Sequence, residues 1–132
     1  MAKGLDQHRE RLEALSLLGK DLTRRAGSKC ELCEANGVKL SIHEVPPVPK
    51  MPELEHCIFI CETCSEQITK PKRRDPDHWR CLNTAAWSTQ PAVQVAAVHM
   101  LKQLKEHDWA YDLADTLYLN PEIEEWLGKI EA

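Results

Sequence analysis

Two Cys-x-x-Cys pairs constrain this chain more than any other feature of its sequence. The first is Cys30-Glu31-Leu32-Cys33 and the second is Cys61-Glu62-Thr63-Cys64. Four thiolates at this spacing can close a tetrahedral zinc site that leaves no coordination position open. The sequence therefore predicts one structural Zn²⁺ per chain, held by Cys30, Cys33, Cys61 and Cys64.

A disulfide framework is the alternative use of the six cysteines. The first residues, Met1-Ala2-Lys3-Gly4, are followed by charged residues and lack the apolar segment of a signal peptide. No apolar run approaches the roughly 20 residues that span a bilayer. These features predict a cytoplasmic protein without membrane contact, in which cysteines are reduced or metal-bound. The short paired spacings also favour metal.

Around the cysteines, the apolar pattern predicts short strands and one helix. Val38, Leu40 and Ile42 alternate with polar residues, as in a half-buried strand. Prolines make residues 46–55 an exposed, stiff loop. A second strand, residues 57–60, then delivers Cys61 to the first turn of a helix. This order of elements predicts a treble-clef zinc finger over residues 28–70.

The rest of the chain is predicted to be helical. Leucines recur at helical intervals over residues 5–27, where Gly27 is a natural stop. Further helices are expected to start at Asp75-Pro76, at Pro91, at a cap formed by Asp108, and at Asn120-Pro121. The predicted fold is α+β and mostly helical. It is a single domain, 1–132, in which the treble clef packs with the N-terminal helix and a helical bundle over residues 75–130.

Charge is unevenly distributed along the chain, whose formal net charge is −4. Residues 81–132 hold 3 Lys/Arg against 8 Asp/Glu, which argues against a generally basic surface for nucleic acid. Seven cations elsewhere are candidate nucleic-acid contacts if folding gathers them: Arg24, Arg25, Lys29, Lys70, Lys72, Arg73 and Arg74. The simpler interpretation is that the first two compensate a helix end and the run after residue 69 is a solvated linker.

Two cysteines, Cys57 and Cys81, remain after the four-cysteine assignment. Core packing is the preferred interpretation, since most free cysteines behave as small buried hydrophobic residues. Alternatively, the spacing of His78 and Cys81 could place two ligands on one helix face and form a second site with Cys57 and His43. His56, beside Cys57, is a possible substitute ligand, but a less natural one than the two intact Cys-x-x-Cys pairs.

Several strings of residues together resemble PhnA-like proteins, a family named after alkylphosphonate-utilisation operons. They are Ser28-Lys29-Cys30-Glu31-Leu32-Cys33, His43-Glu44-Val45-Pro46-Pro47, Ile60-Cys61-Glu62-Thr63-Cys64, His78-Trp79-Arg80-Cys81-Leu82, Pro91-Ala92-Val93-Gln94-Val95 and Asp115-Thr116-Leu117-Tyr118-Leu119. The resemblance covers roughly residues 25–127 and corresponds to the N-terminal zinc-binding region of larger relatives, which continue into a small β-barrel.

The family label has been attached to phosphonoacetate hydrolysis. A two-metal hydrolase needs Asp/His ligand sets and an open metal position, and this sequence shows neither.

The cysteine spacing is also similar to that of HNH endonucleases, whose ββα-metal core is often braced by two such pairs. There, the first strand ends in adjacent histidines, a metal ligand and a general base. The corresponding place reads Ile42-His43-Glu44-Val45. The resemblance therefore makes His43 a candidate ligand and puts Glu44 where the base is expected, while Ser65 stands where a further metal-binding histidine is common. The catalytic set is at best partial, so a treble clef without nuclease activity is favoured.

Two classes of function follow from these patterns. The first is a noncatalytic zinc-binding module that engages an unknown protein partner or associates with itself. The second is nucleic-acid binding, with or without cleavage by a divergent HNH-type nuclease. If the protein is an enzyme, such a nuclease is favoured over a phosphonate hydrolase.

Overall fold

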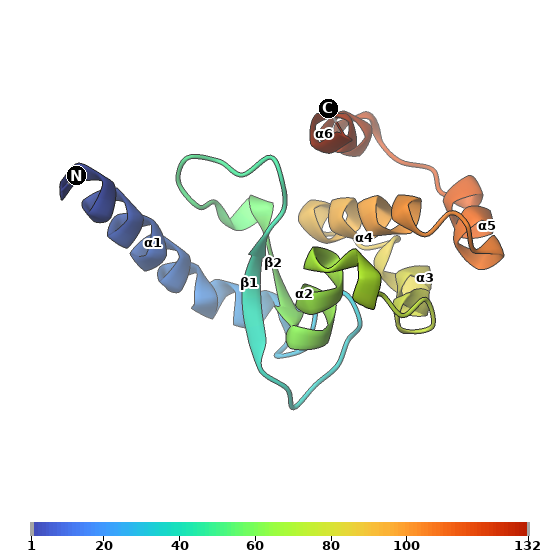
Figure 1. Cartoon of the computed structure of the whole chain (residues 1–132), viewed down its shortest axis with the longest axis horizontal. Coiled ribbons are helices and arrows are strands. Elements are labelled where there is room, and N and C mark those ends of the chain that lie inside the picture. Colours follow the sequence, from blue (N-terminus) through green and yellow to red (C-terminus); the bar gives the residue numbers. More distant parts are fainter. Residues whose placement is uncertain (1, 132) are drawn as a thin grey trace.

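The computed structural model describes residues 2–131, with side chains from residue 6 to residue 130. The fold is α+β and mostly helical, as the sequence predicts (Figure 1). In chain order, with η for 3₁₀-helices, the elements are α1 (Ala2–Ala26), β1 (Leu40–Glu44), η1 (Leu54–His56), β2 (Cys57–Cys61), α2 (Glu62–Thr69), η2 (Pro71–Arg73), η3 (His78–Cys81), α3 (Leu82–Ala85), α4 (Pro91–Gln103), α5 (Asp108–Thr116) and α6 (Pro121–Glu131).

The sheet is a single antiparallel pair in the middle of the molecule (Figure 1). Leu40 lies opposite Cys61 and Glu44 lies opposite Cys57. The strand predicted from Val38 begins two residues later, because Gly37 turns the chain with a φ of 67° and Val38 is 47% exposed. This register places Leu40, the first residue of β1, beside Cys61, the first cysteine of the second pair.

Helix α1 ends where the sequence predicts, one residue before Gly27. Gly27 and Ser28 both have positive φ, and the Ser28 N–H donates to the Thr23 carbonyl at 3.1 Å. Of the predicted leucine stripe, Leu22 is fully buried whereas Leu12 is 52% exposed. The reason is that the N-terminal part of α1 projects away from the strands (Figure 1). Of the described residues of this helix, only Leu22 near its C-terminal end is buried, while Arg11 reaches Glu44 of β1 through its side chain.

In the helical part, α4 is the central element. It begins at Pro91 as predicted and buries seven residues: Ala92, Val93, Val95, Ala97, Val98, Met100 and Leu101. The α3, α5 and α6 helices all contact it. Because α4 is apolar on most of its surface, it needs neighbours on several sides.

Two predicted helix starts differ from the structure. The chain after Asp75 forms a 3₁₀ turn and a four-residue α-helix in place of one regular helix. Asp108 is not a cap: His107 occupies the cap position, and Asp108 is the first residue of α5. In contrast, the Asn120 Oδ1 atom accepts a hydrogen bond from the Ile123 N–H at 3.0 Å, so the predicted start of α6 is confirmed.

Most buried apolar side chains of residues 28–70 and of residues 75–130 belong to one hydrophobic cluster, which includes Cys30 near the strands and Leu127 in α6. Trp79 is completely buried in it, between the cysteine region and the helices. No helix within residues 2–131 combines the length and the apolar character that crossing a membrane requires.

Candidate metal centre

The four cysteines of the two pairs come from two backbone turns. In the first, the Cys30 N–H donates to the Ala35 carbonyl at 2.9 Å, and the Glu34 N–H donates to the Cys30 carbonyl at 2.9 Å. Glu34 adopts a positive φ to close this turn. In the second, Cys61 ends β2 and precedes α2, so Cys64 falls in the first turn of the helix. Each turn therefore presents two sulfurs from a fixed backbone.

These turns bring all four Sγ atoms within 4.8 Å of one another. The Cys30 and Cys64 sulfurs are 3.7 Å apart, and those of Cys33 and Cys61 are 3.6 Å apart. Tetrahedral coordination with Zn–S bonds of about 2.3 Å separates the sulfurs by about 3.8 Å. A disulfide requires about 2.05 Å, and all six cysteines of the chain are free. The cluster therefore has the dimensions of a metal site and can hold one ion.

Burial and mutual contact perturb the cysteine thiols. The neighbouring Cys64 thiol lowers the pKa of Cys30 to about 4, while burial raises the pKa of Cys33 to about 11. Sharing a proton with Cys30 and burial both raise the pKa of Cys64. Backbone N–H groups add to the stabilisation of the Cys30 thiolate, and that of Cys33 lies 3.4 Å from its sulfur. A divalent cation would complete the deprotonation of such a site, since metal binding releases thiol protons.

Glu31, a spacer inside the first pair, fastens this turn to its surroundings. Its carboxylate accepts a hydrogen bond from the Phe59 N–H of β2 at 2.8 Å. It also accepts a bidentate pair from Arg25 of α1, at 2.8 and 3.0 Å. The Arg25 guanidinium reaches the Cys57 carbonyl as well, at 2.7 Å. The first cysteine turn is thereby joined to α1 and β2, a role that the Cys-x-x-Cys pattern does not reveal.

The residues considered for a second metal site are not brought together as a set. Cys57 is buried near Glu44 and Arg25, and burial raises its pKa to about 11. Cys81 and His78 instead lie beside the four-cysteine cluster, where the His78 Nε2 atom is 3.2 Å from the Cys64 sulfur. Burial, and after it the neighbouring cysteine sulfurs, raise the pKa of Cys81 to about 12. Among the described residues, the four paired cysteines form the one group with metal-binding geometry.

The candidate catalytic pair, His43 and Glu44, occupies successive positions of β1. Successive strand side chains leave opposite faces of a sheet. Burial lowers the pKa of His43, while the Glu44 carboxylate accepts a hydrogen bond from Arg11 of α1 at 2.6 Å. The strand thus directs the two groups apart, and Glu44 is engaged in an ion pair.

Four of the seven candidate nucleic-acid contacts form bonds within the molecule. Arg25 pairs with Glu31, as described above. Arg74 donates to the Gln67 and Ile68 carbonyls at 2.8 and 3.0 Å, at the C-terminal end of α2. Arg73 and Lys70 both approach the Glu66 carboxylate, at 2.5 and 3.9 Å. Arg74 is therefore held by the end of α2, whereas Arg73 and Lys70 form ion pairs that stay exposed to solvent.

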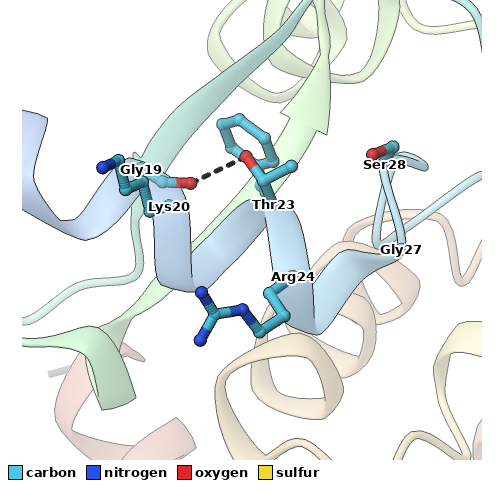
Figure 2. Close-up of a pocket in the computed structure, with 7 residues that line it drawn as sticks. Gly19, Lys20, Thr23, Arg24, Gly27 and Ser28 are labelled. Atoms are coloured by element: carbon cyan, nitrogen blue, oxygen red, sulfur yellow. Dashed lines mark hydrogen bonds between the residues drawn. The ribbon is translucent and has the colours of Figure 1, made fainter.

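Arg24 lies on a shallow hollow of about 680 Å³ along the C-terminal half of α1, which Lys20, Thr23 and Phe59 also line. Figure 2 shows that the Lys20 and Arg24 side chains extend in different directions. The Thr23 hydroxyl donates to the Gly19 carbonyl at 2.7 Å. The charged groups of this hollow do not converge on one ligand position.

Comparison with known proteins gives no assignment for this arrangement. No family model, no curated protein and no solved structure matches the chain.

Proposed function

We propose that this protein is a noncatalytic, structural zinc-binding protein whose helical part serves as a protein-interaction module. Cys30, Cys33, Cys61 and Cys64 would hold one Zn²⁺ as thiolates. The observation that supports this proposal most directly is the spacing of the paired sulfurs, 3.6 and 3.7 Å, beside the roughly 3.8 Å of a tetrahedral zinc–sulfur site.

Zinc is preferred because of the donor set. Four cysteine sulfurs are soft ligands, which select zinc, copper(I) or iron–sulfur clusters over magnesium and calcium, and a tetrahedral four-sulfur geometry is typical of zinc or iron–sulfur sites. A single ion among four sulfurs has no open position for substrate or water. The site would then act as a crosslink between the first cysteine turn, β2 and α2.

A protein partner is preferred to nucleic acid because of the surface that the chain presents. Arg25, Arg73 and Arg74 are engaged in intramolecular bonds. The helical part carries exposed aromatic side chains, including Tyr111 at 59% and Tyr118 at 91% exposure. Aromatic residues are enriched at protein interfaces, whereas nucleic-acid surfaces need free cations. Membership of the PhnA-like family stays a prediction.

The metal content of purified protein tests the proposal. Wild-type protein is expected to carry about one zinc per chain, and Cys30→Ser and Cys61→Ser to lose the metal and to lower the folded fraction, chiefly over residues 28–70, because structural zinc binding is coupled to folding. Cys81→Ser is the matched control, since this thiol lies beside the cluster without belonging to it. Elemental analysis and circular dichroism give both readouts. Full thermal stability of metal-free wild type would contradict the proposal.

Light scattering over a range of concentrations tests the interaction module. Self-association is expected to weaken on Tyr118→Ser if a second copy is the partner. If the wild-type protein stays monomeric at all concentrations, self-association is excluded and the proposed partner is a different protein. Steeply salt-dependent binding of a DNA or RNA duplex would instead favour the nucleic-acid alternative.

A further inference from the structure

Among the described contacts, one side-chain nitrogen from outside the four cysteines lies within hydrogen-bond distance of a cluster sulfur. It belongs to His78. Its Nε2 atom lies 3.2 Å from the Cys64 Sγ atom, within the range of a hydrogen bond to sulfur. The ring packs edge-on against Trp79, with centroids 5.2 Å apart and planes at 85°. His78 is the first residue of η3, so this contact joins the helical part of the chain to the candidate metal centre.

The position of His78 is fixed by a second contact with the same helix that carries Cys64. The completely buried Trp79 donates from Nε1 to the Gln67 Oε1 atom at 2.8 Å. The same oxygen accepts a hydrogen bond from the Asp75 N–H at 2.8 Å. Gln67 follows Cys64 by three residues in α2. Because residues three apart share one helix face, η3 is held directly over the sulfur.

A nitrogen donor at this place has a definite chemical use. Four thiolates around one Zn²⁺ leave a net charge of −2, and thiolate sulfur is stabilised by N–H groups aimed at it. The Cys30 sulfur has the Cys33 N–H for this purpose, at 3.4 Å. For Cys64, the neighbouring side-chain nitrogen is that of His78. Mutation of a group that hydrogen-bonds to a metal ligand typically lowers metal affinity by 10- to 100-fold.

We propose that His78 is a positioning residue that donates its Nε2–H to the Cys64 thiolate, keeps this sulfur on the metal and slows metal release. This inference rests on the proposed zinc site. His78 itself does not coordinate the ion, because the four sulfurs already fill a tetrahedron. The protein would thus use the first turn of its helical part to close the site held by residues 30–64.

The experiment measures the rate at which bound zinc passes to a chromogenic chelator. His78→Phe keeps a ring of similar size and removes the donor, and it is expected to release zinc about 10-fold faster or more at unchanged stoichiometry. His78→Gln can restore an N–H donor, so its rate is expected between the two. His107→Phe is the matched control: His107 is also partly buried, pairs with Glu106 and precedes α5. It is expected to release zinc at the wild-type rate.

The tautomer of His78 in the wild-type protein provides a readout that needs no variant. Long-range ¹H–¹⁵N spectra of the zinc-loaded chain are expected to show the proton on Nε2. A proton on Nδ1 alone would overturn the proposal, and so would coupling between Nε2 and a substituted ¹¹³Cd ion, which would make His78 a ligand. Equal release rates for wild type and His78→Phe would also overturn it. If wild type holds no metal, the zinc site itself fails; if it holds one and these signatures are absent, only the role of His78 fails.

Discussion

Residues 28–70 contain two five-residue strands and one eight-residue helix gathered around four sulfurs, whereas residues 75–130 contain helices gathered around the aliphatic side chains of α4. The first region buries few large apolar side chains, namely Leu32, Val45, Ile58 and Ile60, and is joined to α1 by the ion pair between Arg25 and Glu31. The second is built around an apolar central helix, α4. Short elements that bury little surface need a crosslink, and longer helices can be stabilised by packing.

Metal removal is expected to separate the two regions most strongly. Structural zinc contributes roughly 10–16 kcal/mol of apparent binding free energy in small zinc domains, so a strong chelator should unfold most of residues 28–70. Amide hydrogen exchange measured by mass spectrometry should rise by orders of magnitude in β1, β2 and α2, and by less in α4. Equal loss of protection in α4 would show that the two regions unfold as one unit.

Truncation of a core leucine is the converse experiment. Leu101 in α4 is completely buried, so Leu101→Ala is expected to lower the free energy of unfolding by about 2–5 kcal/mol. Zinc content should stay at the wild-type level, because Leu101 lies in α4, outside the segments that carry the four cysteines. Leu17→Ala in α1 is the control, since Leu17 is 79% exposed and its loss should change stability by about 0.5 kcal/mol or less. Chemical denaturation gives both values. Loss of zinc from Leu101→Ala would contradict this separation.

The junction between the regions is expected to give the smallest effect. Gln67→Leu removes the acceptor for the Trp79 indole and the Asp75 N–H, and leaves a buried donor unpaired. A loss of about 1–3 kcal/mol is expected, accompanied by faster zinc release, because η3 is no longer held over Cys64. Gln7→Leu on the exposed surface of α1 is the control. A stable Gln67→Leu variant with unchanged zinc release would show that the regions meet mainly through apolar contacts.

The sequence predicts those features that depend on spacing along the chain. The Cys-x-x-Cys pairs locate the four sulfurs, because each pair is closed by its own turn. The apolar pattern of residues 91–103 locates α4, and Gly27 locates the end of α1. These signals are local, so they persist in the folded molecule.

Features that depend on partners distant in sequence are not predictable in this way. The sequence predicts that Arg25 compensates a helix end and that Arg74 belongs to a solvated linker, yet each is bound by groups that only folding brings near. From the sequence, the spacing of His78 and Cys81 indicates two side chains on one face of a helix. The chain instead forms a 3₁₀ turn, and His78 reaches a sulfur of the first site. A histidine 14 residues after Cys64 is the signal that a search for outer-sphere donors could have used.

Trp126 in α6 makes a contact whose consequence concerns the order of folding. Its indole Nε1 donates to the Pro46 carbonyl at 2.8 Å, and its ring lies 4.7 Å from that of His56, so α6 closes on a loop 80 residues earlier in the chain. Contacts of such long range form after local ones, because closing the intervening loop costs entropy. On the ribosome, the cysteine turns and the strand pair can therefore assemble before α6 is synthesised and contacts the loop over residues 46–55.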